Sequence, residues 1–260
     1  MSAFRVLYEH RYMLYATTLN DIRARYTGTF LGLLWAAIYP FLFLSLYALV
    51  YTMILKVRLE QYTSFEYVLL IFAGLIPFIG FAEALSLSTV SVVTNKGLLR
   101  NTIFPVELLP AKAVLTSSVS MTVGLIGLIT ILWARGEFSV VQLAVLPVLA
   151  MQLLFSIGLG WILAALNVFF RDIGQIMGVI VLFLMLVSPI GYTRDMIPSG
   201  MMPLLYPNPL FYLIELYRSI LIFGTVPWTF ALVFLLLSVG IFVLGYTLFR
   251  RLKPVFSEHV

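Results

Sequence analysis

Residues 30–55 have the sequence FLGLLWAAIYPFLFLSLYALVYTMIL, and none of these side chains is charged. A membrane-spanning helix needs roughly 20 apolar residues, because each residue rises about 1.5 Å and the hydrocarbon core is about 30 Å thick. The stretch therefore predicts a first transmembrane helix near Phe30–Leu55. The residues before it alternate charged and apolar side chains and lack the short apolar core of a cleavable signal, so we expect this helix to remain in the mature protein.

Five further apolar segments lie between the remaining charges, and each predicts another span. They are Tyr67–Thr94, Ala113–Ala134, Val141–Asn167, Ile173–Tyr192 and Pro227–Phe249. The whole chain is 62% hydrophobic and only 10% charged. Soluble domains contain about 25% charged residues, so this composition indicates a membrane protein.

Residues 196–223 are also apolar, but they contain Pro198, Pro203, Pro207 and Pro209. Each proline removes a backbone donor, so this stretch cannot form one regular span. We predict two short re-entrant helices, Gly200–Tyr206 and Leu210–Phe223.

The basic residues indicate the orientation. With six spans, 11 of the 16 Lys and Arg fall on the side of the N-terminus and five fall on the other side. Cytoplasmic loops carry the excess of basic residues, which places both termini in the cytoplasm. We therefore predict an all-α integral membrane protein with six transmembrane helices. Residues 1–260 form a single transmembrane domain, with an interface helix over residues 1–28, a bundle over 30–249 and a cytoplasmic tail over 250–260.

The N-terminal segment 2–25 has an apolar and aromatic side at three- and four-residue steps. Its members are Phe4, Leu7, Tyr8, Tyr12, Tyr15, Leu19 and Ile22. This pattern predicts an amphipathic helix that lies in the cytoplasmic membrane interface. A soluble helix that packs on a partner remains the alternative.

Several kinds of chemistry are missing from the sequence. It has no cysteine, two distant histidines and no phosphate-binding loop of the G-x-x-x-x-G-K-[ST] type, so we expect no metal site and no ATP hydrolysis by the chain itself. The basic residues form no dense tract, which argues against nucleic acid. Glu83 is the one acid placed clearly inside a predicted span; it either lines a polar path or faces a neighbouring helix or the outer interface.

The first predicted span carries an aromatic residue at every fourth position. These residues are Trp35, Tyr39, Phe43, Tyr47 and Tyr51. Such a ladder offers a continuous uncharged surface on which the C–H faces of sugars can stack, so it predicts a channel for a glycan. Ordinary helix packing and anchoring at the membrane interface are the alternatives.

Small residues point to close helix packing. Gly28–Gly32 and Gly174–Gly178 fit the G-x-x-x-G pattern, which lets two helices approach within one chain or between two chains.

Four groups of residues resemble the permease subunits of polysaccharide ABC exporters, which include O-antigen, capsule and teichoic acid exporters. They are DIRARYTGTFLGLLW over residues 21–35, RNTIFPVELLP over 100–110, NVFFRD over 167–172, and the pairs Ser188-Pro189 and Asn208-Pro209. The resemblance covers roughly residues 20–220.

The resemblance implies a homodimer in the bacterial cytoplasmic membrane, bound to two copies of a cytoplasmic subunit that holds ATP and Mg. The transported substrate would be a polysaccharide linked to a polyprenyl diphosphate. Arg5, Arg23 and Arg25 are then candidates for the diphosphate, although topology or lipid headgroups also account for them. Lys96, Arg100 and Phe104 lie in the segment that would couple to the ATPase; a simple basic loop is the alternative there.

Three other functions compete with this interpretation. An ABC permease for a drug or lipid would have a pocket in place of a continuous aromatic channel. A membrane-embedded enzyme acting on lipid-linked sugar would need paired acids or histidines, and a secondary carrier would need internal inverted symmetry.

Overall fold

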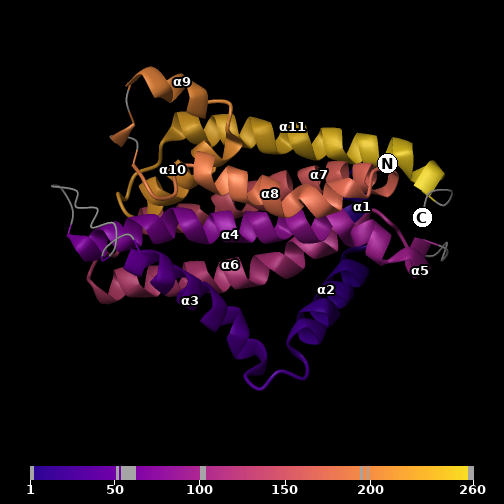
Figure 1. Cartoon of the computed structure of the whole chain (residues 1–260), viewed down its shortest axis with the longest axis horizontal. Helices are drawn as coiled ribbons and strands as arrows, with labels where there is room; N and C mark the ends of the chain where they lie inside the picture. The colour runs from indigo at the N-terminus through magenta and orange to yellow at the C-terminus, as the bar shows by residue number, and fades with distance from the viewer. Residues whose placement is uncertain are drawn as a thin grey trace.

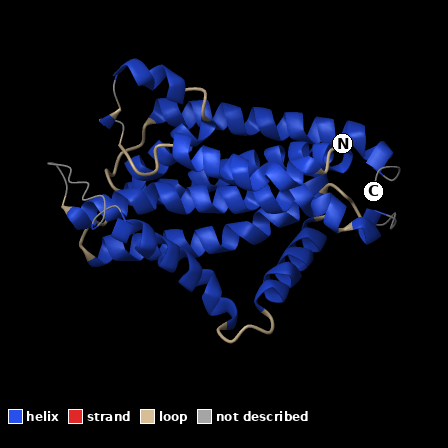
Figure 2. Cartoon of the chain, viewed as in Figure 1, coloured by secondary structure: helices blue, strands red, loops and turns tan. Residues whose placement is uncertain are grey.

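The computed structural model describes residues 3–50, 53, 63–99, 104–193, 196–197 and 199–256. Within these ranges every regular element is helical and no strand is present (Figure 2). Five long helices lie side by side along the longest axis (Figure 1). They are α4 (Ser64–Thr94), α6 (Leu108–Ala134), α7 (Val145–Phe169), α8 (Asp172–Val187) and α11 (Trp228–Leu252).

Four of the described helices are long and apolar enough to cross a membrane: Ser64–Thr94, Leu108–Ala134, Val140–Phe169 and Trp228–Val255. They coincide with the second, third, fourth and sixth predicted spans. The described part of the predicted first span forms α3 (Trp35–Leu49), while residues 51, 52, 54 and 55 of that span lie outside the described residues. The predicted fifth span forms the shorter apolar helix α8.

Helix α4 is the central helix of the bundle. Its most apolar 18-residue window is 83% buried, whereas the corresponding windows of the other three long helices are 33–44% buried. Thr63 begins the helix with a capping box: its hydroxyl accepts from the Glu66 backbone N–H, and its own N–H donates to the Glu66 carboxylate at 2.8 Å. This reciprocal pair satisfies two donors that a helix start otherwise leaves without partners.

Helices α7 and α11 pack closely through Gly158 and Gly245. A Cβ added at Gly158 would lie 2.6 Å from the backbone carbonyl of Ile241. Small residues at such a crossing allow two backbones to approach in a membrane. The close contact therefore depends on Gly158, which is not part of either predicted G-x-x-x-G pair.

The predicted N-terminal helix is divided in two, α1 (Ala3–Glu9) and α2 (Arg11–Tyr26), with the break at His10. The buried residues of these helices are Ala3, Val6, Leu14 and Thr18, while Phe4, Tyr8, Tyr12 and Tyr15 are exposed. The small and aliphatic side thus packs on the bundle, and most of the predicted aromatic side faces outward.

Helices α2 and α3 form a V whose tip points away from the bundle (Figure 1). Gly28 and Gly32 lie in the connection, with φ angles of +80° and +52°. A glycine adopts such left-handed angles at little cost. The interpretation of Gly28–Gly32 as a helix-packing pair is therefore wrong, because these residues make a turn.

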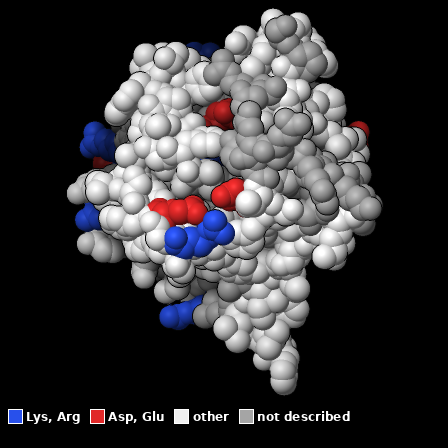
Figure 3. Space-filling model, turned by 90° about the vertical axis from the view of Figure 1, so that its left-hand side faces the viewer, with Lys and Arg blue, Asp and Glu red and all other residues white. Residues whose placement is uncertain are grey.

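Two short helices occupy the end of the bundle opposite the termini (Figure 1). They are α9 (Met202–Leu205), preceded by a 3₁₀ turn over Ser199–Met201, and α10 (Pro209–Leu221). Asn208 caps α10 by accepting from the Leu210 N–H at 3.0 Å. Acidic and basic side chains lie next to one another on this end of the molecule (Figure 3), where Arg135 pairs with Glu137 at 2.8 Å.

Candidate functional site

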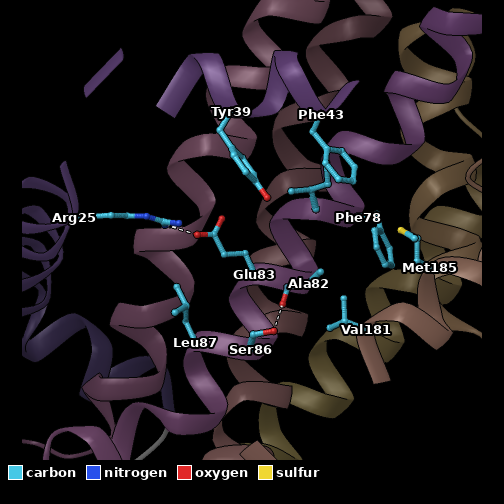
Figure 4. Close-up of a pocket in the computed structure, with 11 residues that line it drawn as sticks. Arg25, Tyr39, Phe43, Phe78, Ala82, Glu83, Ser86, Leu87, Val181 and Met185 are labelled. Carbon is cyan, nitrogen blue, oxygen red and sulfur yellow. Dashed lines mark hydrogen bonds and ion pairs between the residues drawn. The ribbon is translucent and has the colours of Figure 1, made fainter. Parts of the chain in front are cut away.

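A pocket of about 440 Å³ opens between α2, α3, α4 and α8. Figure 4 shows the side chains that line it. They are Arg25, Tyr39, Phe43, Phe78, Ile79, Ala82, Glu83, Ser86, Leu87, Val181 and Met185. The pocket thus combines one ion pair with a mostly apolar and aromatic wall.

Arg25 and Glu83 form the polar part of this wall. Their side chains make an ion pair between the C-terminal end of α2 and the middle of α4 (Figure 4). The Glu83 side chain is 19% exposed and the Arg25 side chain 40% exposed, so the pair lies at the mouth of the pocket. Glu83 therefore both contacts a neighbouring helix and lines the pocket, and its role in a transport path stays a prediction.

Aromatic side chains from two helices form the wall next to the ion pair. Tyr39 and Phe43 come from successive turns of α3, and Phe78 comes from α4. Tyr39 points its hydroxyl into the pocket on the side of the Glu83 carboxylate (Figure 4). Such a wall can hold the apolar face of a ligand, while the guanidinium of Arg25 can hold an anionic group.

The other predicted channel and diphosphate residues lie elsewhere or are not described. Trp35 is in α3 but does not line the pocket. Tyr47 belongs to α3, but its side chain is not among those described, and Tyr51 lies outside the described residues. Arg5 pairs with Glu9 at 2.7 Å, which raises its pKa, and Arg23 is exposed on α2.

A second ion pair holds α2 one helical turn before Arg25. The Asp21 carboxylate lies 2.8 Å from the Lys112 ammonium near the start of α6. Asp21 and Arg25 are four residues apart and so share one face of α2. Helix α2 is thereby joined to both α6 and α4 beside the pocket.

The predicted coupling segment leads directly into α6. Lys96 is exposed in α5 (Lys96–Leu99), Arg100 lies outside the described residues, and Phe104 is partly buried against the apolar cluster around Trp161. Beyond it, the Glu107 carboxylate accepts from the Lys253 ammonium at 2.8 and 2.9 Å.

Two buried polar groups were missed by the sequence reasoning. Tyr217 donates to the Gln152 side chain at 2.8 Å, and Gln152 donates to the Pro77 carbonyl at 2.8 Å, which joins α10, α7 and α4. Arg218 is one of the five basic residues that the sequence places on the side opposite the N-terminus, and its side chain is 1% exposed. The signal that could have found it is a basic residue three positions after Glu215 inside an apolar helix.

The part of the chain that the structure describes is helical, and four of its helices are long and apolar enough to cross a membrane, which indicates an integral membrane protein. Residues 12–222 match the ABC-2 type transporter family, and the chain belongs to this family. It is a membrane subunit of a transporter.

Relatives with assigned roles are similar over most of their length. The chain is 27% identical over 248 residues to an O-antigen export system permease protein, RfbA, of Klebsiella pneumoniae, covering 95% of this chain and 94% of the relative. It is 29% identical to RfbA of Myxococcus xanthus, over 83% and 82% of the two chains. It is also 28% identical to the polysialic acid transport protein KpsM of Escherichia coli, over 78% and 79%.

Proposed function

We propose that this chain is the membrane-spanning subunit of an ATP-driven exporter that moves a polysaccharide linked to a polyprenyl diphosphate across the bacterial cytoplasmic membrane. The observation that carries the proposal is the similarity of the chain to permeases named for O-antigen and polysialic acid, which supports a glycan as the substrate. The pocket lined by Arg25, Tyr39 and Phe43 supports a ligand that has an anionic group and flat apolar faces.

The pocket suits the two chemical parts of such a substrate. An arginine pairs with phosphate oxygens through two parallel hydrogen bonds, so Arg25 is the proposed contact for the diphosphate. Tyr39 and Phe43 would present their flat faces to the sugars. The other aromatic residues of the four-residue repeat, Trp35, Tyr47 and Tyr51, are proposed to contact the glycan beyond the pocket. Glu83 would hold Arg25 in place until the substrate arrives.

The proposed complex is a homodimer with two cytoplasmic ATPase subunits, and the bound ATP and Mg belong to those subunits. The side of α8 that faces away from the bundle is apolar and exposed, as expected of a surface that meets lipid or a second copy. Its residues are Ile176, Val179, Leu182, Phe183 and Leu186. In a dimer formed there, the open side of the pocket would become one wall of a channel.

The proposed topology has six spans, with α3 and α8 as the two shorter ones, α9 and α10 as re-entrant helices and both termini in the cytoplasm. The charge bias of the sequence supports it, as do the positions of both termini and α5 at one end of the bundle (Figure 1).

Coupling to ATP hydrolysis would pass through the segment that contains Lys96, Arg100 and Phe104. This segment precedes the start of α6, so its displacement would move the part of α6 in which Lys112 pairs with Asp21 of α2. Because α2 also carries Arg25, movement of α6 would change the position of Arg25 at the pocket. The two ion pairs of α2 are thus the proposed link between the ATPase and the substrate.

The experiment is export of lipid-linked glycan by cells in which Tyr39→Leu and Phe43→Leu are combined. We expect at least a tenfold loss of export, on the order of 1.4 kcal/mol of lost stacking for the two rings together. Copurification with the ATPase subunit should be unchanged.

Phe138→Leu is the matched control, because Phe138 is an exposed aromatic residue that does not line the pocket. Normal export by the Tyr39/Phe43 variant would show that these rings do not contact the substrate. Normal export by cells that lack the chain altogether would favour an ABC permease for a different lipid or a drug.

A further inference from the structure

A second groove, of about 490 Å³, lies between α1 and the C-terminal end of α11. It is separate from the pocket around Arg25 and shares no lining residue with it. Its lining residues are Ala3, Phe4, Phe242, Val243, Tyr246, Thr247, Arg250 and Arg251. The floor is therefore aromatic, and the end of the groove is basic.

The aromatic floor is fixed by ring packing. The Phe4 and Phe242 ring centroids are 4.8 Å apart, and Trp161 packs behind Phe242 at 5.0 Å and behind Tyr246 at 5.4 Å. Thr247 donates its hydroxyl to the Leu244 carbonyl at 2.8 Å, so this group is engaged within α11. A ligand in the groove thus meets a preformed apolar surface.

The charged side chains in the lining of the groove are basic. Of the described residues that line it, Arg250 and Arg251 are basic, and none is acidic. The groove is thus complementary to a ligand with an anionic group at one end and an apolar body.

The exposed side of α11 continues this surface away from the arginines. Leu236, Val239, Gly240 and Val243 are exposed and lie at helical spacing along one side. At about 1.5 Å per residue, the helix rises about 21 Å from Leu236 to Arg250, and one leaflet of the hydrocarbon core is about 15 Å thick. This length of helix is sufficient for an acyl chain that lies along α11 within one leaflet while its headgroup contacts the two arginines.

We propose that this groove binds one anionic phospholipid, with an acyl chain along α11 and over the aromatic floor and the phosphate at Arg250 and Arg251. Basic pockets next to transmembrane helices bind anionic headgroups in this way. The bound lipid would join α1 to α11 at the end of the bundle where the chain begins and ends. This inference does not depend on the transported substrate.

The test is native mass spectrometry of the delipidated full-length chain, titrated with phosphatidylglycerol and, separately, with phosphatidylcholine. We expect one tightly bound phosphatidylglycerol and no comparable phosphatidylcholine. Arg250→Gln combined with Arg251→Gln should weaken the binding about 30-fold, which corresponds to about 1 kcal/mol for each arginine.

Two further variants separate a site from general attraction to a basic surface. Arg11→Gln combined with Arg171→Gln removes the same charge from exposed residues outside the groove and should leave the affinity within about threefold. Thr247→Trp fills the groove without changing charge and should abolish the bound lipid.

Three results would overturn the proposal. The first is an equal loss in the two double-arginine variants, and the second is full affinity in Thr247→Trp. The third is displacement of phosphatidylglycerol by a lower concentration of polyprenyl diphosphate, which would assign the groove to the transported lipid instead.

Discussion

Replacement of Arg218 by methionine should destabilise the protein more than any change to an exposed charge. The guanidinium donates to the carbonyls of Leu70 at 3.2 Å and Tyr192 at 2.9 Å, to the Ile190 carbonyl, and to the Glu215 carboxylate at 3.3 Å. It therefore joins α10 to α4 and to the segment after α8. Methionine fills much of the same volume but makes none of these contacts.

The magnitude follows from what remains after the substitution. Glu215, with a side chain 13% exposed, would be left without its cation, and the loop carbonyls would lose a charged donor. Removing one partner of a buried pair costs about 3–5 kcal/mol, so we expect a loss of this size in the free energy of unfolding. Adding Glu215→Gln removes the unpaired carboxylate and should restore about half of the loss.

The assay is unfolding of the purified chain in mixed micelles, followed by fluorescence of its four tryptophans. Arg135→Met is the matched control, because Arg135 lies at the same end of the bundle in exposed ion pairs and should cost less than about 1 kcal/mol. If Arg218→Met were as stable as Arg135→Met, the buried carbonyl cluster around Arg218 would not exist in the folded protein.

Two further predictions concern the ion pairs near the pocket and the coupling segment. Arg25→Glu and Glu83→Arg should each lower glycan export at least fivefold, roughly the effect of 1 kcal/mol for a partly exposed pair, and the double exchange should restore part of it. If the double exchange restored no export, the ion pair between Arg25 and Glu83 would not contribute to transport. Lys253→Met should raise ATP hydrolysis per glycan exported about fivefold, because the loss of the Glu107 contact loosens the start of α6 from the C-terminal helix. An unchanged ratio of hydrolysis to export would exclude this role.

The positions of the long helices were predictable because apolar segments between charges are a strong signal. Their boundaries were less accurate, for local reasons. Helix α6 begins at Leu108, five residues before the predicted Ala113, because proline is tolerated in a first helical turn and Lys112 is neutralised by Asp21. Helix α8 ends at Val187 instead of Tyr192 because Pro189 disfavours helical geometry in the residue before it.

Part of the candidate site was also predictable. The four-residue repeat on α3 identified Tyr39 and Phe43, and the isolated acid identified Glu83. Their meeting with Arg25 could not be predicted, because the turn at Gly28 and Gly32 decides where α2 ends relative to α4. Contacts such as Arg218 with the Leu70 carbonyl join residues 148 positions apart, and no local pattern encodes them.

The location of lipid-linked glycan in cells lacking this gene tests the central claim most directly. We predict that the polyprenyl-linked polysaccharide accumulates on the cytoplasmic side of the membrane and disappears from the cell surface. Restoring the gene should return it to the surface. A normal amount of surface polysaccharide in the deletion strain would contradict the proposed substrate, and the chain would then be a transport subunit for another molecule.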